Sequence, residues 1–360
     1  MNKHQYVVIM AGGIGTRFWP KSRTNFPKQF LDILNIGKTL IQSTFDRFSS
    51  FIPLENIYVV TSGEYVNIVK KQLPELPLQN ILAEPSRKNT APCIAYISFK
   101  LNKLDPNALL IVAPADHLIS DNIAFKKVCL EALSFTQKHN AIITLGIKPT
   151  YPNTGYGYIQ YEQQPVSDNV FKVKTFTEKP NLELAKTFLA SGEFLWNAGI
   201  FVWQVKNIIT AFEKHLPEVF DLFVSQKDKL NTLEEEEALQ EIYPFSASVS
   251  IDVGIMEKAD NVYVIPSSFG WSDLGTWNSA YENLQKDSHA NAVSSHNAML
   301  IDTSNSIVHA KDNKLIVIQG LTGYIVVDTD DVLLICRKDK EQEIKEYVGD
   351  VKRQKGEKYL

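Results

Sequence analysis

Short apolar runs alternate with longer amphipathic segments over the first 146 residues of the chain. The runs have the length and β-branched content of buried strands, near 6–11, 57–61, 80–83, 108–113 and 141–145. The segments between them have polar starts and apolar positions at helical spacing, over about 39–49, 64–72, 90–103 and 122–137. This alternation is typical of βαβ units, and it predicts an α/β fold with a mostly parallel sheet.

The segment 122–137 shows how these helices are recognised. Its apolar positions Phe125, Val128, Ala132 and Phe135 are three or four residues apart and therefore share one helical face. Either Ser120 or Asp121 can accept hydrogen bonds from the first free backbone N–H groups. We therefore expect the helix to begin directly after one of these two residues.

Beyond residue 146 the pattern changes. Tyr158–Tyr161 and Val170–Phe176 predict antiparallel strands laid over the sheet, in a lobe that we assign to the acceptor substrate. Helices are expected over 181–190 and 204–213, and an acidic helix is expected from Thr232. The spacing from Thr232 to Glu235 predicts a capping box, with Glu234–Glu237 as a solvated first turn.

After residue 290 the elements become short and β-like. They are separated by Asp, Asn, Gly and Ser, and they lie at 298–301, 306–309, 315–318, 323–327 and 331–335. Their regular spacing suggests a β-solenoid without proving one. A short helix over Glu341–Val348 and a frayed tail over 352–358 complete the chain. The sequence thus divides into a domain of residues 1–290 and a small β domain of residues 291–360.

Composition limits the range of functions. The 360 residues carry 44% hydrophobic and 22% charged side chains, as in ordinary globular proteins. A net charge of −4 argues against nucleic acid as a partner, so an anionic ligand would need a local cluster of cations. The three cysteines show no CxxC spacing, and no apolar run has membrane-spanning length. We expect a protein without a membrane segment that works in the reducing cytoplasm.

The richest candidate chemistry lies in residues 11–30, AGGIGTRFWPKSRTNFPKQF, directly behind the first apolar run. A strand that leads into a glycine-rich turn with Arg17, Lys21, Arg23 and Lys28 is an arrangement for binding phosphate. A GxGxxG dinucleotide motif would need glycine where Phe18 stands. Gly37–Thr39 ends like a P-loop, but Asp32 replaces its first glycine. Neither nucleotide motif fits, and a plain glycine turn with exposed cations remains an alternative.

Eight blocks resemble the sugar-1-phosphate nucleotidyltransferases, and among them the mannose-1-phosphate guanylyltransferases. The blocks stand in the order expected for that family, and they are AGGxGTRxWPxSR with PKQF at 11–30, EPSRKNTAP at 84–92, PADH at 114–117, TGYGYI at 154–159, EKP at 178–180, WNAGIF at 196–201, SIDVGIMEK at 250–258 and WSDLGTW at 271–277. The resemblance implies a Rossmann-like, GT-A-like nucleotidyltransferase domain followed by a β-helix-like C-terminal domain.

The implied reaction is attack by mannose 1-phosphate on the α-phosphorus of GTP, which gives GDP-mannose and pyrophosphate. Because the nucleophile is already an anion, catalysis reduces to positioning and charge neutralisation, and no general base is needed. Consistent with this, the sequence lacks an HExxH motif and a Ser-His-Asp order. The resemblance further implies Mg²⁺ as the cofactor, a homodimer, and an enzyme without the isomerase module of its longer relatives.

The resemblance assigns residues to three roles. Arg17, Lys28, Asp116 and Asp273 are the expected catalytic residues, and Asp116 and Asp273 are the expected metal ligands. The nucleotide is expected to contact Ala11, Gly12, Gly13, Gly15, Thr16, Arg17, Lys28, Glu84, Asn89, Thr90, Pro114 and Asp116. The sugar phosphate is expected to contact Gly157, Glu178, Lys179, Asn197 and Asp273. Trp196 and Trp271 could line the sugar pocket or belong to the core.

Three other hypotheses stay open from the sequence, and the third of them is a nicotinamide-dependent oxidoreductase that would bind NAD tightly. The first keeps the chemistry but uses another hexose 1-phosphate, or dTTP or UTP in place of GTP. The second is a regulatory subunit that binds GDP-mannose without turnover. Retention of Lys28, Asp116, Lys179 and Asp273 together argues against the second, because a protein that only binds has less need of this set.

Overall fold

The computed structural model describes residues 2–13, 15–311 and 313–360. The chain forms two compact units. The first, which we call the sheet unit, comprises Met1–Gly12, Phe45–Ala115 and Ile119–Trp271. The second, which we call the loop unit, comprises Gly13–Thr44, Asp116–Leu118 and Ser272–Leu360. In the described ranges, no helix combines the length and the apolarity that a membrane span requires.

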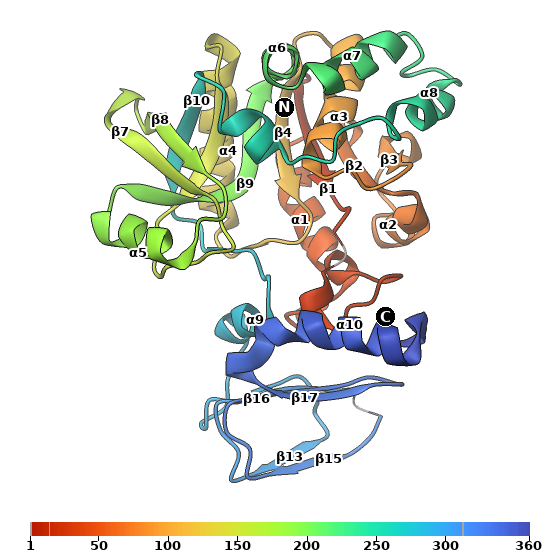
Figure 1. Ribbon diagram of the computed structural model, residues 1–360, viewed down its shortest axis with the longest axis vertical. Coiled ribbons are helices and arrows are strands. Elements are labelled where there is room, and N and C mark those ends of the chain that lie inside the picture. The colour runs from red at the N-terminus through yellow and green to blue at the C-terminus, as the bar shows by residue number, and fades with distance from the viewer. Residues whose placement is uncertain (1, 14, 312) are drawn as a thin grey trace. The chain divides into compact units, whose positions relative to one another are not determined.

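The sheet unit is built on one sheet of nine strands in the order β3-β2-β1-β4-β9-β6-β10-β8-β7 (Figure 1). Strands β1 to β4 are parallel, β6 is parallel to β10, and β9 runs antiparallel between β4 and β6. The strands are β1 (Gln5–Met10), β2 (Ile57–Ser62), β3 (Ile81–Glu84), β4 (Leu109–Pro114), β6 (Ile142–Ile147), β7 (Tyr158–Ser167), β8 (Val170–Thr177), β9 (Phe194–Gln204) and β10 (Val262–Ser267). The short strands β5 (Leu118–Ile119) and β11 (Trp271–Ser272) fall where the two units divide the chain.

Helices cover both faces of this sheet, which explains why its strands are apolar throughout. Val7, Val8 and Ile9 of β1 are all fully buried, although neighbouring side chains of a strand point to opposite faces. One face belongs to a core shared with α3, α6 and α7, while α4 packs against β4, β6, β9 and β10. The helices are α2 (Val66–Gln72), α3 (Thr90–Leu104), α4 (Asn122–Lys138), α5 (Leu182–Ser191), α6 (Val205–His215), α7 (Pro217–Gln226) and α8 (Glu235–Ile242), and α1 (Leu40–Ser49) begins in the loop unit.

Single-turn helices join these elements. They are η1 (Thr16–Phe18), η2 (Lys28–Phe30), η3 (Leu54–Asn56), η4 (Gly63–Tyr65), η5 (Leu78–Asn80), the π-helical η6 (Asp252–Met256), η7 (Lys338–Glu343) and η8 (Glu357–Tyr359). Strand and helix bounds predicted within the first 146 residues are confirmed to within two residues. Asp121 is the N-cap of α4, because its carboxylate accepts from the N–H groups of Ile123 and Ala124.

Two predictions for the middle of the chain are wrong in detail. β7 and β8 are antiparallel, but they extend the edge of the main sheet and do not lie over it. The capping box from Thr232 to Glu235 does not form. Helix α8 begins at Glu235, whose carboxylate accepts from Lys100 Nζ at 2.5 Å and from the hydroxyl of Tyr96. A buried cation therefore takes the carboxylate that the sequence assigned to a solvated turn.

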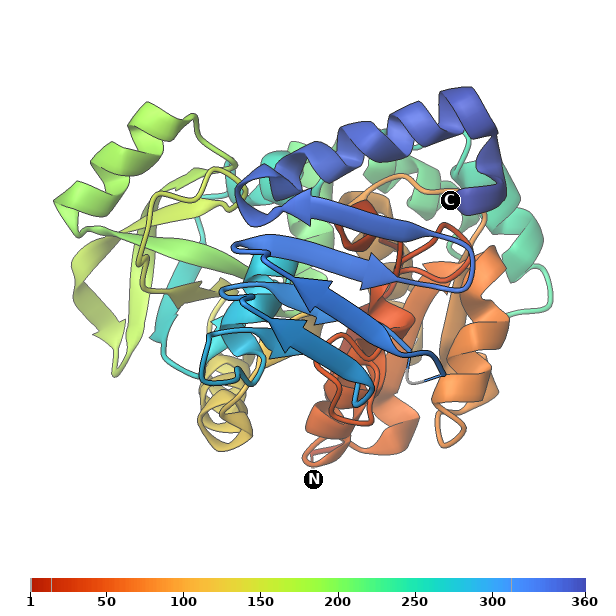
Figure 2. The same ribbon diagram turned by 90° about the horizontal axis from the view of Figure 1, so that it is seen from below.

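The loop unit contains a short β-helix (Figure 2). Strands β12, β14 and β16 are parallel, as are β13 and β15, and β17 closes the first group in antiparallel orientation. Ile307 pairs with Ile325 and Ala298 pairs with Ile316, an advance of eighteen positions, whereas Ala292 pairs with Ile307, an advance of fifteen. The elements are α9 (Trp277–Asn283), β12 (Ala292–Val293), β13 (Ala298–Ile301), β14 (Ile307–His309), β15 (Ile316–Gln319), β16 (Tyr324–Asp328), β17 (Leu333–Arg337) and α10 (Ile344–Lys355).

The glycine-rich loop and the β-helix share one hydrophobic core. Phe18 and Trp19 lie in the same buried cluster as Ile307, Ile325 and Ile344. The ring of Phe18 also packs at 5.0 Å from that of Trp277, measured between centroids. Apolar side chains that surround the predicted phosphate loop are therefore supplied by residues almost 300 positions away in sequence.

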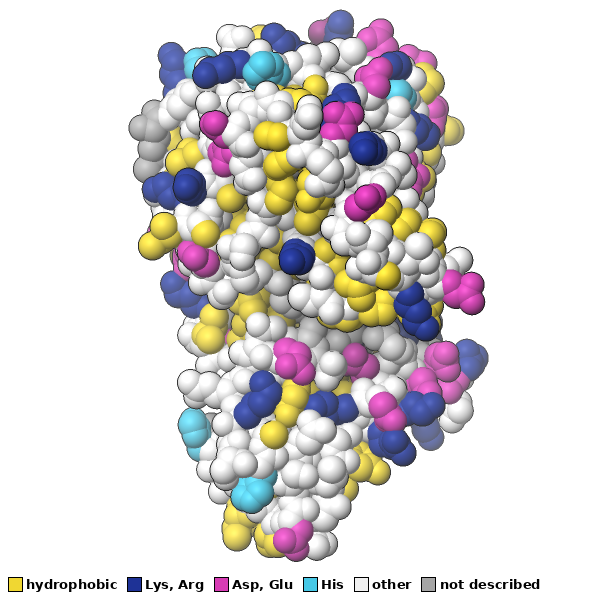
Figure 3. Space-filling view, turned by 90° about the vertical axis from the view of Figure 1, so that its left-hand side faces the viewer, with side chains coloured by type: hydrophobic (Ala, Val, Ile, Leu, Met, Phe, Trp, Pro, Cys, Tyr) yellow, Lys and Arg dark blue, Asp and Glu magenta, His cyan; other side chains and the backbone are white. Residues whose placement is uncertain are grey.

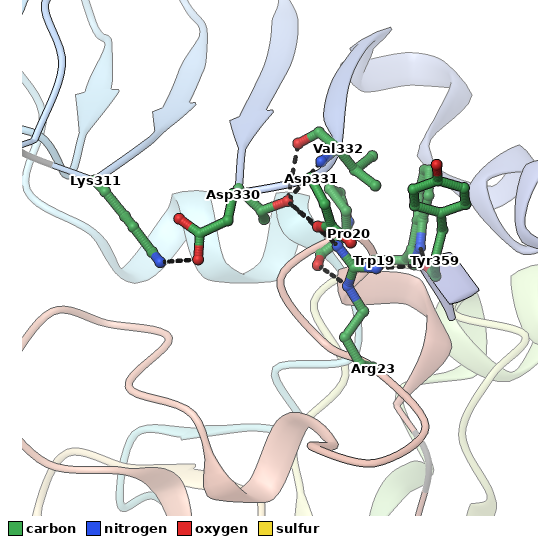
Figure 4. A network of polar contacts seen from close by, with 9 residues as sticks. Trp19, Pro20, Arg23, Lys311, Asp330, Asp331, Val332 and Tyr359 are labelled. Atoms are coloured by element: carbon green, nitrogen blue, oxygen red, sulfur yellow. Dashed lines mark hydrogen bonds and ion pairs between the residues drawn. The ribbon is translucent and has the colours of Figure 1, made fainter. Parts of the chain in front are cut away.

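The end of the chain is ordered, so the prediction of a frayed tail is wrong. Helix α10 continues to Lys355, and the carbonyl of Tyr359 accepts from Trp19 Nε1 at 2.7 Å and from Arg23 Nη1 at 2.6 Å (Figure 4). Arg23 also forms an ion pair of 2.6 Å with Asp331, in the turn after β16. One arginine thus joins the glycine-rich loop, the β-helix and the C-terminal turn.

Candidate active site

The glycine-rich loop packs tightly on Lys28. Gly15 has φ +63°, and a Cβ built on it would lie 2.5 Å from the Cβ of Lys28. The side-chain amide of Gln29 donates to the carbonyl of Gly13 at 2.9 Å. A residue other than glycine at position 15 would be strained and would collide with Lys28, so the sequence must keep glycine there to hold the loop against the lysine.

Lys28 is the centre of a polar cluster in the loop unit. Only 5% of it is exposed, and its Nζ lies 2.8 Å from Asp116 Oδ2. The same ammonium donates to the carbonyls of Asp273 at 2.9 Å and Leu274 at 3.0 Å. Sequence positions 28, 116 and 273 are thus brought together by one side chain. A buried ammonium with three oxygen partners is held in a fixed position.

Asp116 follows β4 directly, at the carboxyl edge of the parallel strands where open α/β sheets bind ligands. Burial alone would raise the pKa of its carboxyl, but the Lys28 ammonium and His117 hold that pKa below its ordinary value. His117 Nε2 lies 4.0 Å from Asp116 Oδ1. The carboxylate is therefore ionised at neutral pH and can bind a cation.

Asp273 lies in a tight turn of the loop unit. Its Oδ1 accepts from the N–H of Gly275 at 3.0 Å, and the following Leu274 has φ +43°, which is rare for a residue with a side chain. Such a strained position persists only where the surroundings enforce it. Here the bonds of Lys28 to the carbonyls of Asp273 and Leu274 enforce it.

The donor set suits a hard divalent cation. Asp116 and Asp273 offer carboxylate oxygens, and Mg²⁺ typically takes one or two carboxylates together with substrate phosphate oxygens. Within the described part of the chain no group of three or more His, Cys, Asp and Glu side chains could hold a metal by itself. A metal at this cluster would therefore depend on substrate oxygens to complete its coordination.

The remaining cations of residues 11–30 have different surroundings. Arg17 is exposed in η1, beside the half-buried Thr16. Lys21 instead donates to the carbonyl of Asp32 at 2.5 Å, and burial lowers its pKa to about 8. The Arg23 guanidinium donates to the carbonyl of Tyr359 in the C-terminal turn described above. Lys21 and Arg23 thus contact protein oxygens, as Lys28 does, and their role as phosphate ligands stays a prediction. On the face shown in Figure 3, Lys and Arg side chains are interspersed with Asp and Glu.

The segment predicted to read the base begins with a buried carboxylate in the sheet unit. Glu84 ends β3, its Oε1 accepts from the hydroxyl of Tyr243 at 3.0 Å, and its Oε2 would lie 3.7 Å from a Cβ on Gly12. Burial raises the pKa of Glu84 to about 7 even though the Tyr243 hydrogen bond lowers it. Ala11 directly follows β1, and its N–H donates to Val60. Glu84 therefore stands beside Gly12, the second residue of the glycine-rich loop.

Asn89, Thr90 and Pro114 have structural contacts. Asn89 has φ +68° and caps α3, with its side chain accepting from the N–H of Thr90. The Thr90 hydroxyl accepts from the N–H of Ile251 at 2.9 Å and ties the base segment to residues 249–252. Pro114 is the last residue of β4. These bonds fix the backbone of the predicted nucleotide segment.

Four of the five predicted sugar-phosphate residues form a second cluster, within the sheet unit, whereas Asp273 belongs to the Lys28 cluster of the loop unit. A Cβ on Gly157 would lie 2.7 Å from Glu178 Oε2 and 3.3 Å from Asn197 Cβ, so these residues are in close contact. Glu178 forms an ion pair of 2.6 Å with Lys179, whose side chain is 61% exposed and whose φ is +47°. The Lys179 ammonium is thus accessible to solvent while it is paired with Glu178.

Sequence reasoning missed two residues of these clusters. Tyr243 binds Glu84, and Asp252 accepts from Asn197 Nδ2 at 2.9 Å. Asp252 belongs to the block at 250–258, which carried the resemblance without a role for any of its residues. Tyr243 lies outside every block, and no local signal marks it. Trp196 is 4% exposed and packs in a core with Tyr158 and Ala185, whereas Trp271 is half-buried against that core.

Comparison with known proteins identifies the family. The model of the nucleotidyl transferase family matches residues 6–290. The chain belongs to this family. A second model, the MannoseP isomerase/GMP-like beta-helix domain, matches residues 296–351. The protein is therefore a nucleotidyltransferase with a β-helix domain, and its family generally uses a divalent metal.

Named relatives agree with this assignment. The nucleotidyltransferase is 36% identical over 357 residues to a mannose-1-phosphate guanylyltransferase of Salmonella montevideo, covering 96% of this chain and 73% of the relative. It is 35% identical over 353 residues to the alginate biosynthesis protein AlgA of Pseudomonas syringae pv. tomato, covering 96% and 72%.

A solved structure from Thermus thermophilus, described as a mannose-1-phosphate geranyltransferase, matches with a TM-score of 0.86. Its sequence is 28% identical, and the match covers 97% of this chain and 99% of that one. The agreement extends over both the nucleotidyltransferase domain and the β-helix.

Proposed function

We propose that this nucleotidyltransferase transfers GMP from GTP to α-D-mannose 1-phosphate and releases pyrophosphate and GDP-mannose. The observation that carries the proposal is the Lys28 ammonium, which contacts both the Asp116 carboxylate and the Asp273 backbone. Relatives named for this reaction support the choice of substrates. The sugar cluster around Glu178 and Lys179 supports an acceptor that carries both hydroxyls and a phosphate.

The reaction depends on neutralising the phosphate charges, and proton transfer is less important. A phosphate oxygen of the sugar phosphate attacks the α-phosphorus of GTP, and the bond to the bridging oxygen of the departing pyrophosphate breaks. Lys28 and Arg17 neutralise charge on the triphosphate, while Lys179 holds the attacking phosphate. Asp116 and Asp273 would hold Mg²⁺, which when bound supplies further neutralisation of phosphate charge.

The nucleotide and the sugar are held by different residues. Backbone groups of Ala11, Gly12, Gly13, Gly15 and Thr16 would approach the phosphates. Glu84, Asn89, Thr90 and Pro114 would contact the nucleoside. Gly157, Glu178 and Asn197 would contact the hexose, and Asp273 would contribute to the binding of the sugar phosphate. The close contact of Gly157 with Glu178 and Asn197 supports the assignment of these residues to the hexose.

A pyrophosphate-release assay tests the proposal. GTP with mannose 1-phosphate should give turnover that depends on Mg²⁺ and is abolished by EDTA. ATP, UTP and dTTP, and glucose 1-phosphate in place of the mannose compound, form the comparison series. Turnover with another pair and none with this one would reject the substrate assignment and keep the nucleotidyltransferase chemistry.

A variant at Asp273 separates an enzyme from a protein that only binds. D273A should lose most of its turnover while its circular dichroism spectrum stays unchanged, because its backbone bond to Lys28 is retained. Full turnover in D273A would contradict the metal assignment. Binding of GDP-mannose without any turnover in the wild type would identify a regulatory subunit.

The organisation of the protein is part of the proposal. We assign residues 1–290 to the catalytic domain and residues 291–360 to the C-terminal β domain, supported by the ranges of the two family models. We also propose a homodimer that works in the cytoplasm. The three cysteines are buried and free, as a reducing compartment would keep them.

A further inference from the structure

The side chain of Asn197 has little hydrogen-bonding capacity left for a ligand. Its Oδ1 accepts from the Thr144 hydroxyl at 2.8 Å and from the N–H of Gly199 at 3.1 Å. Because a backbone N–H can only donate, the bond to Gly199 fixes which amide atom is the oxygen. The Nδ2 group donates to Asp252 Oδ1 at 2.9 Å. Asn197 can therefore offer a sugar one N–H donor and no acceptor.

Asp252 is held in place from several directions. It is the first residue of the π-helical turn η6. Such turns are rare in proteins, and those that occur are often at functional sites. The preceding Ile251 is tied to the Thr90 hydroxyl, and the carbonyl of Val249 accepts from the N–H of Ala91. The backbone of Asp252 is thus fixed to the start of α3, while its side chain reaches Asn197 on β9.

The carboxylate of Asp252 lies near the charges of the sugar cluster. Burial, and then the neighbouring Glu178, raise its pKa to about 6, while Lys179 and the bond from Asn197 lower it. One oxygen of Glu178 is taken by Lys179 at 2.6 Å. A carboxylate has about four acceptor positions, and among the described residues Asn197 is the side chain that donates to Asp252, so acceptor capacity remains. Hexose hydroxyls are donors that match it.

On the basis of the proposed function, we propose that Asp252 accepts a hydrogen bond from a ring hydroxyl of the hexose and also fixes the amide of Asn197. Asp252 is then a specificity-determining residue for the sugar phosphate, beside Glu178. Its bond to the sugar is charge-assisted and therefore stronger than a bond between neutral groups. An acceptor of this kind discriminates against an analogue that lacks the hydroxyl, because the carboxylate is then left without its partner.

Combining enzyme variants with deoxy substrates tests this directly. Asp252→Asn keeps the size of the side chain and an oxygen for Asn197 but removes the charge. Values of kcat/KM are measured for wild type and variant with mannose 1-phosphate and with its 2-, 3-, 4- and 6-deoxy analogues. For wild type, kcat/KM with one of the analogues should be about tenfold to a hundredfold lower than with mannose 1-phosphate, as expected for the loss of a charged hydrogen bond. In D252N this penalty should shrink by at least about tenfold, with KM for GTP unchanged.

The controls exclude a merely structural effect. Asp260→Asn removes an exposed carboxylate eight positions along the chain, with a side chain 82% exposed, and should keep the wild-type pattern of penalties. If D252N shows the same penalty as wild type for every analogue, Asp252 does not contact the sugar and the proposal is overturned. Should D252N lose its fold by circular dichroism, Asp252→Ser provides the same comparison with a smaller uncharged side chain.

The experiment keeps this inference separate from the proposed function. Turnover of wild type with GTP and mannose 1-phosphate tests the function itself. If wild type prefers a different hexose 1-phosphate, the deoxy series of that hexose is used. A failed substrate assignment then leaves the test of Asp252 intact, and a failed test of Asp252 leaves the substrate assignment intact.

Discussion

Lys21 and Lys28 differ in the protein oxygens that they contact. Lys28 and Lys21 lie seven positions apart, and both donate to backbone carbonyls in the loop unit. Only Lys28 also contacts a carboxylate assigned to the metal. The number of cations in the stretch 11–30 could be read from the sequence, but which of them face protein oxygens depends on residues far along the chain.

Lys28→Met and Lys21→Met form a matched pair. Each leaves a buried carbonyl without its donor, at a cost of about 1–3 kcal/mol in the free energy of unfolding. K28M should also reduce kcat by about a hundredfold or more, because it removes a fixed cation from the charged centre. K21M should keep kcat within about threefold of wild type. Equal losses of kcat in the two variants would place Lys21 in the catalytic centre as well.

Glu84 makes the free energy of unfolding depend on pH. Burial raises the pKa of its carboxyl from 4.5 to about 7 in the folded protein, so folding favours the protonated form. The stability from Glu84 is therefore fully present below pH 4.5 and is lost as the pH rises through about 7.

Glu84→Gln should remove this contribution. The free energy of unfolding of wild type should fall relative to that of E84Q by about 1–3 kcal/mol between pH 5 and pH 8. Urea titrations of both proteins at the two pH values measure the difference. Parallel pH dependence in the two proteins would show that Glu84 titrates as it does in the unfolded chain. In the assay, E84Q should also reduce the preference for GTP over ITP if Glu84 contacts the 2-amino group of guanine.

At the scale of elements, the last turn of the chain stabilises the first loop. Tyr359 in η8 accepts from Trp19 and Arg23, and Arg23 continues to Asp331. Nearby, Lys311 forms an ion pair with Asp330 in which both side chains are more than half exposed (Figure 4). The two ion pairs differ in burial, because the Arg23 side chain is 14% exposed and the Lys311 side chain is 56% exposed.

Removal of residues 357–360 should therefore destabilise the loop. We expect a truncated chain that ends at Gly356 to lose about 1–3 kcal/mol and to melt several degrees lower, because Trp19 and Arg23 lose their shared acceptor. Its KM for GTP should rise more than its KM for the sugar phosphate. Lys311→Ala should change stability by less than about 0.5 kcal/mol, since exposed ion pairs contribute little. An unchanged melting temperature in the truncated protein would contradict the role of Tyr359.

The sequence pattern predicted an element correctly where that element depends on residues close to it in the chain. The run Val7–Ile9 and the cap at Asp121 carry their own signals, and the structure has them as expected. Glu235 shows the limit of this reasoning. Its capping spacing is local, but Lys100 and Tyr96 come from α3 and take its carboxylate. The same limit hid Tyr243 and Asp252, whose partners lie 159 and 55 positions away.

At the scale of the whole molecule, exposed apolar side chains on the β-helix agree with the proposed dimer. Met299 and Val317 are paired neighbours on β13 and β15, and they are 53% and 56% exposed. Ile301 and Leu315, at or beside the ends of the same strands, are 44% and 58% exposed. A patch of this kind on a small sheet is typical of a surface that another chain covers.

Val317→Glu should dissociate the homodimer. Light scattering of wild type at micromolar concentration should give twice the chain mass of 40.7 kDa, and V317E should give the single mass. The control Val166→Glu changes a valine on β7 that is 50% exposed and should leave the dimer intact. A wild type that is monomeric at this concentration would reject the dimer, and dissociation in V166E instead would place the interface on the sheet unit.

The core shared by Phe18, Trp19 and the β-helix limits how this protein can be recombined with its relatives. In a chimera that joins residues 1–290 of this chain to a foreign C-terminal domain, Phe18 and Trp19 would have to pack against side chains other than those of their own β-helix. Exchange of residues 13–44 together with residues 116–118 and 272–360 would keep that core intact. The useful boundary for engineering thus follows packing, and three segments distant in sequence would have to be transferred together.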